Sequence, residues 1–312
     1  MTEQVAFVFP GQGSQKAGMG AALAANFASA RRIFALADEA LGESLSTLCF
    51  EGPEDALAQT ANTQPAILTC SVAAWTVLHE ELGVAPTVCL GHSLGEFSAL
   101  VAVGALEFTD AVRLVRLRGR AMQEAVPAGV GAMAAIVGIE AERLAALCEQ
   151  HSATGEQVSI ANENGGGQLV VAGHSAAVQR LVADVKASRG KAILLNVSAP
   201  FHCALMQPAA ERLAVALEHV QVHPLQVPVI ANIDAEPNQD ATRVKDLLIR
   251  QITGRVRWEA SVRKALHMGI TRCFELGHGK VLAGLIKRIA PELAVVPVGS
   301  PADLDVLKVG PK

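Results

Sequence analysis

The chain has 312 residues, of which 51% are hydrophobic and 18% are charged, and its charges nearly cancel to a net −4. This length allows a large core with a smaller unit attached, and the composition is that of a globular chain rather than a disordered one. The balance of charges argues against binding to nucleic acid, which needs a concentrated basic surface.

Strand-like and helix-like runs alternate along the chain, and this pattern is typical of an α/β fold with a largely parallel sheet. The first part predicts a buried strand over residues 5–9, helices over 21–40 and 65–82, a second buried strand over 87–90 and a helix over 96–103. The second strand runs directly into Gly91-His92-Ser93-Leu94-Gly95.

The composition changes near residues 126–131, and the next segment has the order strand, helix, strand, strand, helix, strand. The predicted elements are residues 132–137, 141–150, 158–163, 168–172, 175–188 and 191–197, with a turn at the three glycines 165–167. This order is typical of a ferredoxin-like unit. We therefore predict a small ferredoxin-like α+β subdomain of residues 130–198, inserted into a large α/β-hydrolase-like catalytic domain formed by residues 1–129 and 199–312.

The sequence at residues 91–95 matches the G-x-S-x-G pattern between a strand and a helix, which is the context that this motif requires. Its glycines permit a tight turn with Ser93 at the apex, and amides at the start of the following helix face any negative charge that forms there. The pattern predicts that Ser93 is a nucleophile, whereas the alternative interpretation is a purely structural turn.

A serine nucleophile needs a base, and the chain has nine histidines. His92 is next to Ser93, but a neighbour on a sharp turn points away from the apex. His202 follows a proline-containing turn at the point where the chain leaves the small unit, so it can face a cleft between the two units. Position alone makes His202 a candidate and does not decide between it and a structural histidine.

Six cysteines are scattered along the chain without any C-x-x-C spacing. We expect buried free thiols in a reducing compartment rather than disulfides or a metal site. The N-terminus lacks the pattern of a signal peptide, and no apolar run reaches the ~20 residues that a membrane helix needs. The expected location is the cytoplasm, with no membrane contact, no metal and no cofactor.

A series of motifs in this chain resembles the malonyl-CoA:acyl carrier protein transacylase family over essentially its whole length. The motifs are F-P-G-Q-G-S-Q at 9–15, T-Q-P-A at 63–66, G-H-S-L-G-E at 91–96, L-R-G-R-A-M at 117–122, S-A-P-F-H at 198–202 and G-K-V-L at 279–282. The resemblance implies transfer of malonyl from malonyl-CoA to the phosphopantetheine thiol of acyl carrier protein, which supplies fatty acid synthesis.

The resemblance also assigns roles to single residues. It implies that Ser93 carries the acyl group, and that His202 takes the serine proton and later protonates the leaving thiol. The imidazole would be oriented by the backbone carbonyl of Gln251 rather than by a carboxylate. The amides of Gln12 and Leu94 would form the oxyanion hole.

Arg118 matches the arginine that pairs with the free carboxylate of malonate in this family. Malonyl-CoA differs from acetyl-CoA by that carboxylate, and a guanidinium can bind it through two parallel hydrogen bonds. Arg118 shares one predicted helix with other arginines, where a solvated position is the ordinary interpretation. Phe201 resembles the bulky residue that would crowd a methyl branch on the substrate, and its alternative role is simple packing.

Other functions stay open at this point. The enzyme could serve a polyketide synthase or be a component of a malonate decarboxylase. A serine hydrolase would need a carboxylate and then a histidine after Ser93, which Asp234 or Glu275 with His278 could supply. A docking module without chemistry is a further alternative. We expect a monomer that binds its acidic carrier protein through a basic rim, for which the candidates are Arg189, Lys191, Lys280, Lys287 and Arg288.

Overall fold

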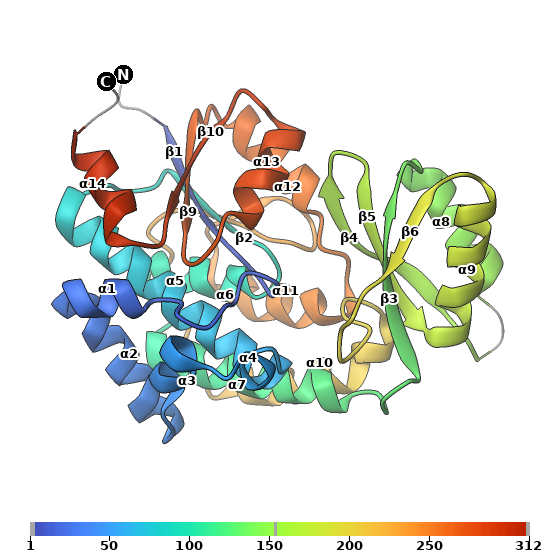
Figure 1. The fold of residues 1–312 in the computed structure, drawn as a ribbon, viewed down its shortest axis with the longest axis horizontal. Helices are drawn as coiled ribbons and strands as arrows, with labels where there is room; N and C mark the ends of the chain where they lie inside the picture. Colours follow the sequence, from blue (N-terminus) through green and yellow to red (C-terminus); the bar gives the residue numbers. More distant parts are fainter. Residues whose placement is uncertain (1–3, 153–154, 310–312) are drawn as a thin grey trace.

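The computed structural model describes residues 4–152 and 155–309 and contains two sheets with helices packed on them (Figure 1). The larger sheet has the order β10-β9-β1-β2-β7-β8 and is parallel except for its last pair, β7 with β8. Its strands are β1 (Val5–Phe9), β2 (Val88–Gly91), β7 (Val229–Ile230), β8 (Pro237–Asn238), β9 (Arg272–Leu276) and β10 (Ala294–Val298). The expected α/β fold with a largely parallel sheet is confirmed.

The central strands β1, β2 and β9 of the larger sheet are buried on both faces, as is typical of a parallel sheet with crossover helices. Val5, Phe7 and Phe9 of β1 pack into one apolar cluster with helices α2, α5, α6 and α7, whereas Ala6 and Val8 pack into another with α12 and α13. The helices of this unit are α1 (Ala21–Asn26), α2 (Ala28–Leu41), α3 (Leu45–Glu51), α4 (Glu54–Leu57), α5 (Thr60–Leu82), α6 (Gly95–Ala102), α7 (Phe108–Glu124), α10 (Gln207–Glu218), α11 (Ala241–Thr253), α12 (Trp258–His267), α13 (Val281–Ile289) and α14 (Pro301–Val309), with a 3-10 turn at Ala204–Met206.

Two helices differ from their predicted bounds. The single helix expected over residues 21–40 is two helices, because the backbone of Phe27 is extended (φ −123°). The helix expected to begin at Pro65 begins at Thr60, so the proline lies inside it. Proline has no N–H to bond the carbonyl four residues earlier, and Arg116 Nη1 donates to that carbonyl, of Ala61, at 2.8 Å.

The smaller sheet is antiparallel with the order β4-β5-β3-β6, and it lies beside the larger unit (Figure 1). Its elements are β3 (Gly131–Val137), α8 (Ala141–His151), β4 (Val158–Gly165), β5 (Gln168–His174), α9 (Ser175–Ala187) and β6 (Lys191–Leu194). Apolar residues of both helices and of the strands form a third core. The predicted order of elements is confirmed. The glycines 165–167 of the predicted turn all have positive φ. The last strand ends at residue 194, three residues earlier than predicted.

All six cysteines are buried and free, as expected, and burial raises the pKa of each thiol. Within residues 4–152 and 155–309, no helix is both long enough and apolar enough to cross a membrane. In the same residues, no cluster of three or more His, Cys, Asp or Glu side chains is arranged to hold a metal ion.

Candidate active site

Ser93 lies in a very tight turn between the end of β2 and the start of α6, and its own φ is 51°. A Cβ on Gly91 would lie 1.9 Å from the carbonyl carbon of Gly95, and a Cβ on Gly95 would lie 2.0 Å from Phe9 O. Both positions therefore require glycine, and the turn lifts the serine side chain above the ends of β1 and β2.

Asn232 holds this turn from the segment that follows β7. Its Oδ1 accepts a hydrogen bond from Ser93 N at 2.7 Å, and its Nδ2 donates to Gly91 O at 2.6 Å. The side chain is buried (1% exposed). No sequence pattern singled out Asn232, because its role depends on contacts about 140 residues away.

His202 contacts Ser93 directly. Its Nε2 lies 2.8 Å from Ser93 Oγ, and its Nδ1 lies 2.9 Å from the backbone oxygen of Gln251. Gln251 is in the last turn of α11, where Gly254 N bonds Arg250 O, so the Gln251 carbonyl is one of those that lack a helical partner. Since a carbonyl only accepts, Nδ1 carries the proton and Nε2 is free to accept the serine hydroxyl proton.

The His202 ring is uncharged near neutral pH. Burial, and next the nearby Arg118 guanidinium, lower the pKa of His202 to about 3. Its backbone, with φ 60°, is in the left-handed region that disfavours side chains, and such strain clusters at functional sites. The arrangement places a neutral base on a serine hydroxyl, which is what nucleophile activation requires.

Arg118 is almost completely buried (1% exposed) and points toward the serine. Its Nη2 donates to Ser93 Oγ at 3.1 Å and to Gln251 Oε1 at 2.9 Å, and its Nη1 donates to Gln64 Oε1 at 2.8 Å. The guanidinium also lies 5.7 Å from the centre of the Phe97 ring. Burial lowers the pKa of Arg118 to about 10, so the side chain keeps its charge at neutral pH.

The other arginines of α7 do not reach the serine. Arg116 is buried against Glu43 and Asn62, while Arg113 and Arg120 are exposed. Two of the four arginines on this helix, Arg113 and Arg120, therefore have the exposed position that is usual for an arginine, and the other two are buried.

A cavity of about 190 Å³ opens above Ser93 between the two units. It is lined by Gln12, Gln64, His92, Ser93, Leu94, Arg118, Met122, Met133, Asn162, Asn164, Val170, Leu195, Val197, Phe201 and His202. Of the predicted site residues, only Gln251 is absent from this wall, because it lies behind Arg118 and His202. The His92 ring turns away from the serine, as expected, and bonds Asn164 Oδ1 at 2.9 Å.

Glu96 is a buried acid (2% exposed) directly behind the site, and sequence reasoning gave it no role. Its Oε2 accepts hydrogen bonds from Gln251 Nε2 at 2.8 Å and from Asn232 N at 3.0 Å. Burial raises the pKa of Glu96 to about 7. The signal that could have found it is its place in the G-H-S-L-G-E motif, where it is the only acid.

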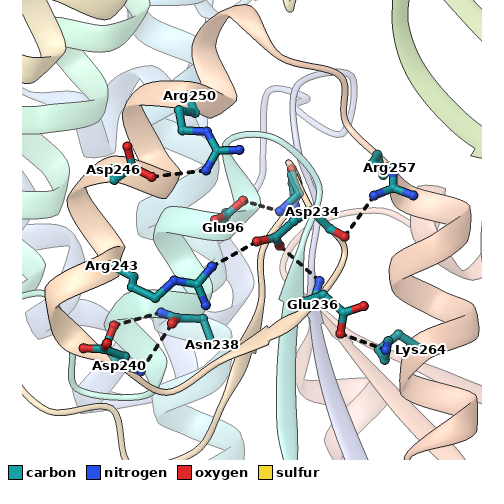
Figure 2. Close-up of polar contacts among 11 residues, drawn as sticks. Glu96, Asp234, Glu236, Asn238, Asp240, Arg243, Asp246, Arg250, Arg257 and Lys264 are labelled. Atoms are coloured by element: carbon teal, nitrogen blue, oxygen red, sulfur yellow. Dashed lines mark hydrogen bonds and ion pairs between the residues drawn. The ribbon is translucent and has the colours of Figure 1, made fainter.

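The alternative hydrolase triad is not formed. Asp234 bonds Arg243 Nη2 at 3.2 Å, and its backbone oxygen accepts from Arg257 at 3.0 Å, as Figure 2 shows. The Glu275 carboxylate accepts from the amides of Leu282 and Ala283 at the start of α13. Among the described residues, no carboxylate is paired with the histidine that contacts Ser93, because the second nitrogen of that ring faces a backbone carbonyl.

Sequence and structure comparisons with known proteins point to the same family. Residues 6–290 match the model of the acyl transferase domain family. A malonyl CoA-acyl carrier protein transacylase of Salmonella typhimurium is 48% identical, with 96% of this chain and 97% of that protein covered. The protein of the same name from Bacillus subtilis (strain 168) is 44% identical, with 97% and 96% covered.

Two solved structures superpose closely on this fold. An acyl carrier protein S-malonyltransferase from Vibrio cholerae has a TM-score of 0.94 and 47% identity, with 98% of this chain and 100% of that chain covered. A malonyl-transacylase in complex with a type II PKS acyl-carrier protein has a TM-score of 0.94 and 45% identity, with 97% and 98% covered.

Proposed function

The chain belongs to the malonyl CoA-acyl carrier protein transacylase family of acyl transferases, and from this premise we propose that Ser93 carries a malonyl group from malonyl-CoA to the phosphopantetheine thiol of an acyl carrier protein. The enzyme is thus an acyltransferase that supplies malonyl units for fatty acid synthesis. The observation that carries the assignment of the site is the buried Arg118 guanidinium 3.1 Å from Ser93 Oγ, beside a histidine at 2.8 Å.

In the first half-reaction, His202 Nε2 takes the proton of Ser93 Oγ as that oxygen attacks the thioester carbonyl. The amides of Gln12 and Leu94 stabilise the negative oxygen of the tetrahedral intermediate. When the intermediate collapses, the carbon–sulfur bond breaks, and His202 gives its proton to the departing thiolate of coenzyme A. Malonyl-serine and free coenzyme A result.

The second half-reaction is the reverse with a different thiol. His202 takes the proton of the carrier protein's phosphopantetheine thiol, and its sulfur attacks the malonyl-serine ester. The serine oxygen then leaves and recovers a proton from His202. Arg118 pairs with the malonyl carboxylate in both halves, because a guanidinium matches a carboxylate with two parallel hydrogen bonds.

We also propose the finer organisation of the fold. Residues 130–198 form a ferredoxin-like subdomain, supported by the order of their elements and by the antiparallel sheet β4-β5-β3-β6. Residues 1–129 and 199–312 form a hydrolase-like catalytic domain, supported by the serine turn between a parallel strand and a helix.

The partner is an acidic carrier protein, which would bind a basic rim near the cavity. The five expected basic residues are all exposed, and Arg288 lines a second groove together with Gln12, beside the first cavity. We propose a cytoplasmic monomer. The complex of a similar transacylase with a type II PKS carrier protein supports a second role for this chain, which is supply of a polyketide pathway.

Changing Arg118 tests this function through the choice of acyl group. Arg118→Ala should lower malonyl transfer by ~10²-fold or more, as expected for loss of a charged hydrogen-bonded pair worth about 3 kcal/mol. Acetyl transfer should rise relative to malonyl transfer, because an unpaired buried guanidinium no longer penalises an uncharged group. Arg118→Lys should recover activity only in part, since an ammonium lacks the planar fork.

The measurement is transfer to carrier protein from malonyl-CoA and acetyl-CoA in parallel. Arg113→Ala is the matched control, because Arg113 is an exposed arginine on the same helix that bonds only Ala40 O and Asp110. An unchanged malonyl-to-acetyl ratio in Arg118→Ala would remove the assignment of this arginine.

A further inference from the structure

Behind Ser93, His202 and Arg118 lies a buried hydrogen-bond network whose centre is the carboxylate of Glu96. We propose that Glu96 is a positioning residue that fixes the orientation of the Gln251 side-chain amide, which in turn aims Arg118 at the malonyl carboxylate. This inference rests on the function proposed above and adds to it a residue that decides selectivity without touching the substrate.

The side-chain amide of Gln251 makes three hydrogen bonds, and all three require the same orientation of its oxygen and nitrogen ends. Its Nε2 donates to Glu96 Oε2 at 2.8 Å and to the backbone oxygen of Ser93 at 3.0 Å, and its Oε1 accepts from Arg118 Nη2 at 2.9 Å. A primary amide has two N–H donors, so both have an acceptor here. The side chain is fully buried, and water cannot replace any of these partners.

The reversed amide orientation is the competing state, because the oxygen and nitrogen ends of an amide have nearly the same shape. In that state the Gln251 oxygen would face two acceptors, the Glu96 carboxylate and the Ser93 carbonyl, while its NH₂ group would face the cationic Arg118. Of the two acceptors for the Gln251 NH₂ group, one is the backbone oxygen of Ser93 and the other is the Glu96 carboxylate. Glu96 is therefore the side chain that keeps the oxygen directed at Arg118.

The same carboxylate oxygen also reaches the turn that holds the nucleophile. Glu96 Oε2 accepts from Asn232 N at 3.0 Å, and the Asn232 side chain bonds Ser93 N and Gly91 O. Two charged groups act on the Glu96 carboxyl electrostatically, Asp234 of like sign and Arg118 of opposite sign. Asp234 is turned toward Arg243 instead (Figure 2), so the contacts that Glu96 makes are to Gln251 and Asn232.

A positioning role and a purely structural role predict different results for different acyl groups. If Glu96 only stabilised the fold, its loss would slow every acyl transfer in proportion. If Glu96 orients Arg118 through Gln251, its loss weakens binding of the malonyl carboxylate and slows malonyl transfer more than acetyl transfer. Glu96→Gln keeps an acceptor oxygen and removes the charge, whereas Glu96→Leu removes both.

The experiment measures acylation of Ser93 from malonyl-CoA and from acetyl-CoA in wild type, Glu96→Gln, Glu96→Leu, Gln251→Leu and the double variant Glu96→Leu/Gln251→Leu. Gln251→Leu keeps the backbone carbonyl that orients His202. We expect the malonyl-to-acetyl ratio to fall about tenfold in Glu96→Leu and to stay within about threefold of wild type in Glu96→Gln. In the Gln251→Leu background the ratio is already low, and Glu96→Leu should lower it no further, because the amide through which it acts is gone.

The proposal is overturned if Glu96→Leu slows both acyl groups equally, or if it lowers the ratio as much without the Gln251 amide as with it. Should Glu96→Leu fail to fold, Gln251→Leu decides alone, since a wild-type ratio in that variant removes the link between Glu96 and Arg118. Failure of the proposed function gives a separate result, in which wild type itself takes no malonyl group from malonyl-CoA.

Discussion

At the scale of single residues, an uncharged base and a buried cation both lie within hydrogen-bond distance of the same serine oxygen. Ser93 Oγ lies 2.8 Å from His202 Nε2 and 3.1 Å from Arg118 Nη2. The cation lowers the pKa of the histidine, and in the proposed mechanism it also pairs with the carboxylate of the acyl group beside the ester that forms. The proposed mechanism therefore gives this one arginine two roles, keeping the base neutral and selecting the substrate.

The low pKa of His202 predicts an unusual pH profile for acylation. With a pKa of about 3, the ring stays neutral as the pH falls from 8.5 to 5.5, so kcat/KM for malonyl-CoA should stay nearly constant. A histidine with the ordinary pKa of about 6.5 would lose about tenfold at pH 5.5. The measurement is single-turnover acylation across this range.

Glu96→Gln is the matched control for that profile, because burial raises the pKa of Glu96 to about 7, which lies inside this range. A fall with a midpoint near 6.5 in both wild type and Glu96→Gln would contradict the neutral buried base.

Part of this site can be predicted from residues and part cannot. G-x-S-x-G identifies Ser93 because the turn is local in sequence, whereas position alone made His202 a candidate without deciding between a base and a structural histidine. The Gln251 contact to His202 is made by a backbone carbonyl, which any residue type supplies, so only family resemblance pointed to it. Asn232 and Glu96 act through hydrogen bonds that join distant segments. No motif contains Asn232, and the motif that contains Glu96 gave no role to that residue.

At the scale of secondary structure elements, the site is made from the ends of strands and helices. β2 ends and α6 begins around Ser93, and the free carbonyl of the last turn of α11 receives His202. The bounds of β1 followed from its apolar run. The bounds of α5 did not, because the carbonyl left free by Pro65 is bonded by Arg116, and that contact spans 55 residues.

The tight turn predicts a severe effect for Gly95→Ala. Its Cβ would lie 2.0 Å from Phe9 O, so β1 and α6 must separate. We expect loss of ~2 kcal/mol or more in the free energy of unfolding, with acylation reduced well beyond the loss of folded protein. Urea unfolding and acylation rates measure the two effects.

Gly284→Ala is the matched control, since Gly284 lies within α13 and a Cβ there meets nothing within 4 Å. That variant should be neutral or more stable by up to ~1 kcal/mol, because alanine favours helix over glycine. Equal stability of the two variants would show that the turn can widen without cost.

At the scale of the whole molecule, the cavity exists only where the two units meet. Met133, Asn162 and Val170 of the smaller sheet face Ser93 and Arg118 of the larger unit. β4 is joined to the segment after α11 by hydrogen bonds from Glu163 N to Val256 O (2.9 Å) and from Val256 N to Ala161 O (2.8 Å). The order of strand-like and helix-like runs predicted the elements of both sheets, whereas the packing of the two sheets beside each other depends on contacts that no local pattern encodes.

Ser93 as the carrier of the malonyl group is tested most directly by the intact mass of the protein after mixing with malonyl-CoA, followed by addition of carrier protein that bears phosphopantetheine. We expect one malonyl adduct, located at Ser93 by peptide mapping, that disappears from the enzyme as it appears on the carrier protein. Ser93→Ala should fold normally, gain no adduct and transfer no malonyl group. Malonyl transfer by Ser93→Ala at a rate comparable to wild type, or an adduct that forms at another residue and passes to the carrier, would show that Ser93 does not carry the malonyl group.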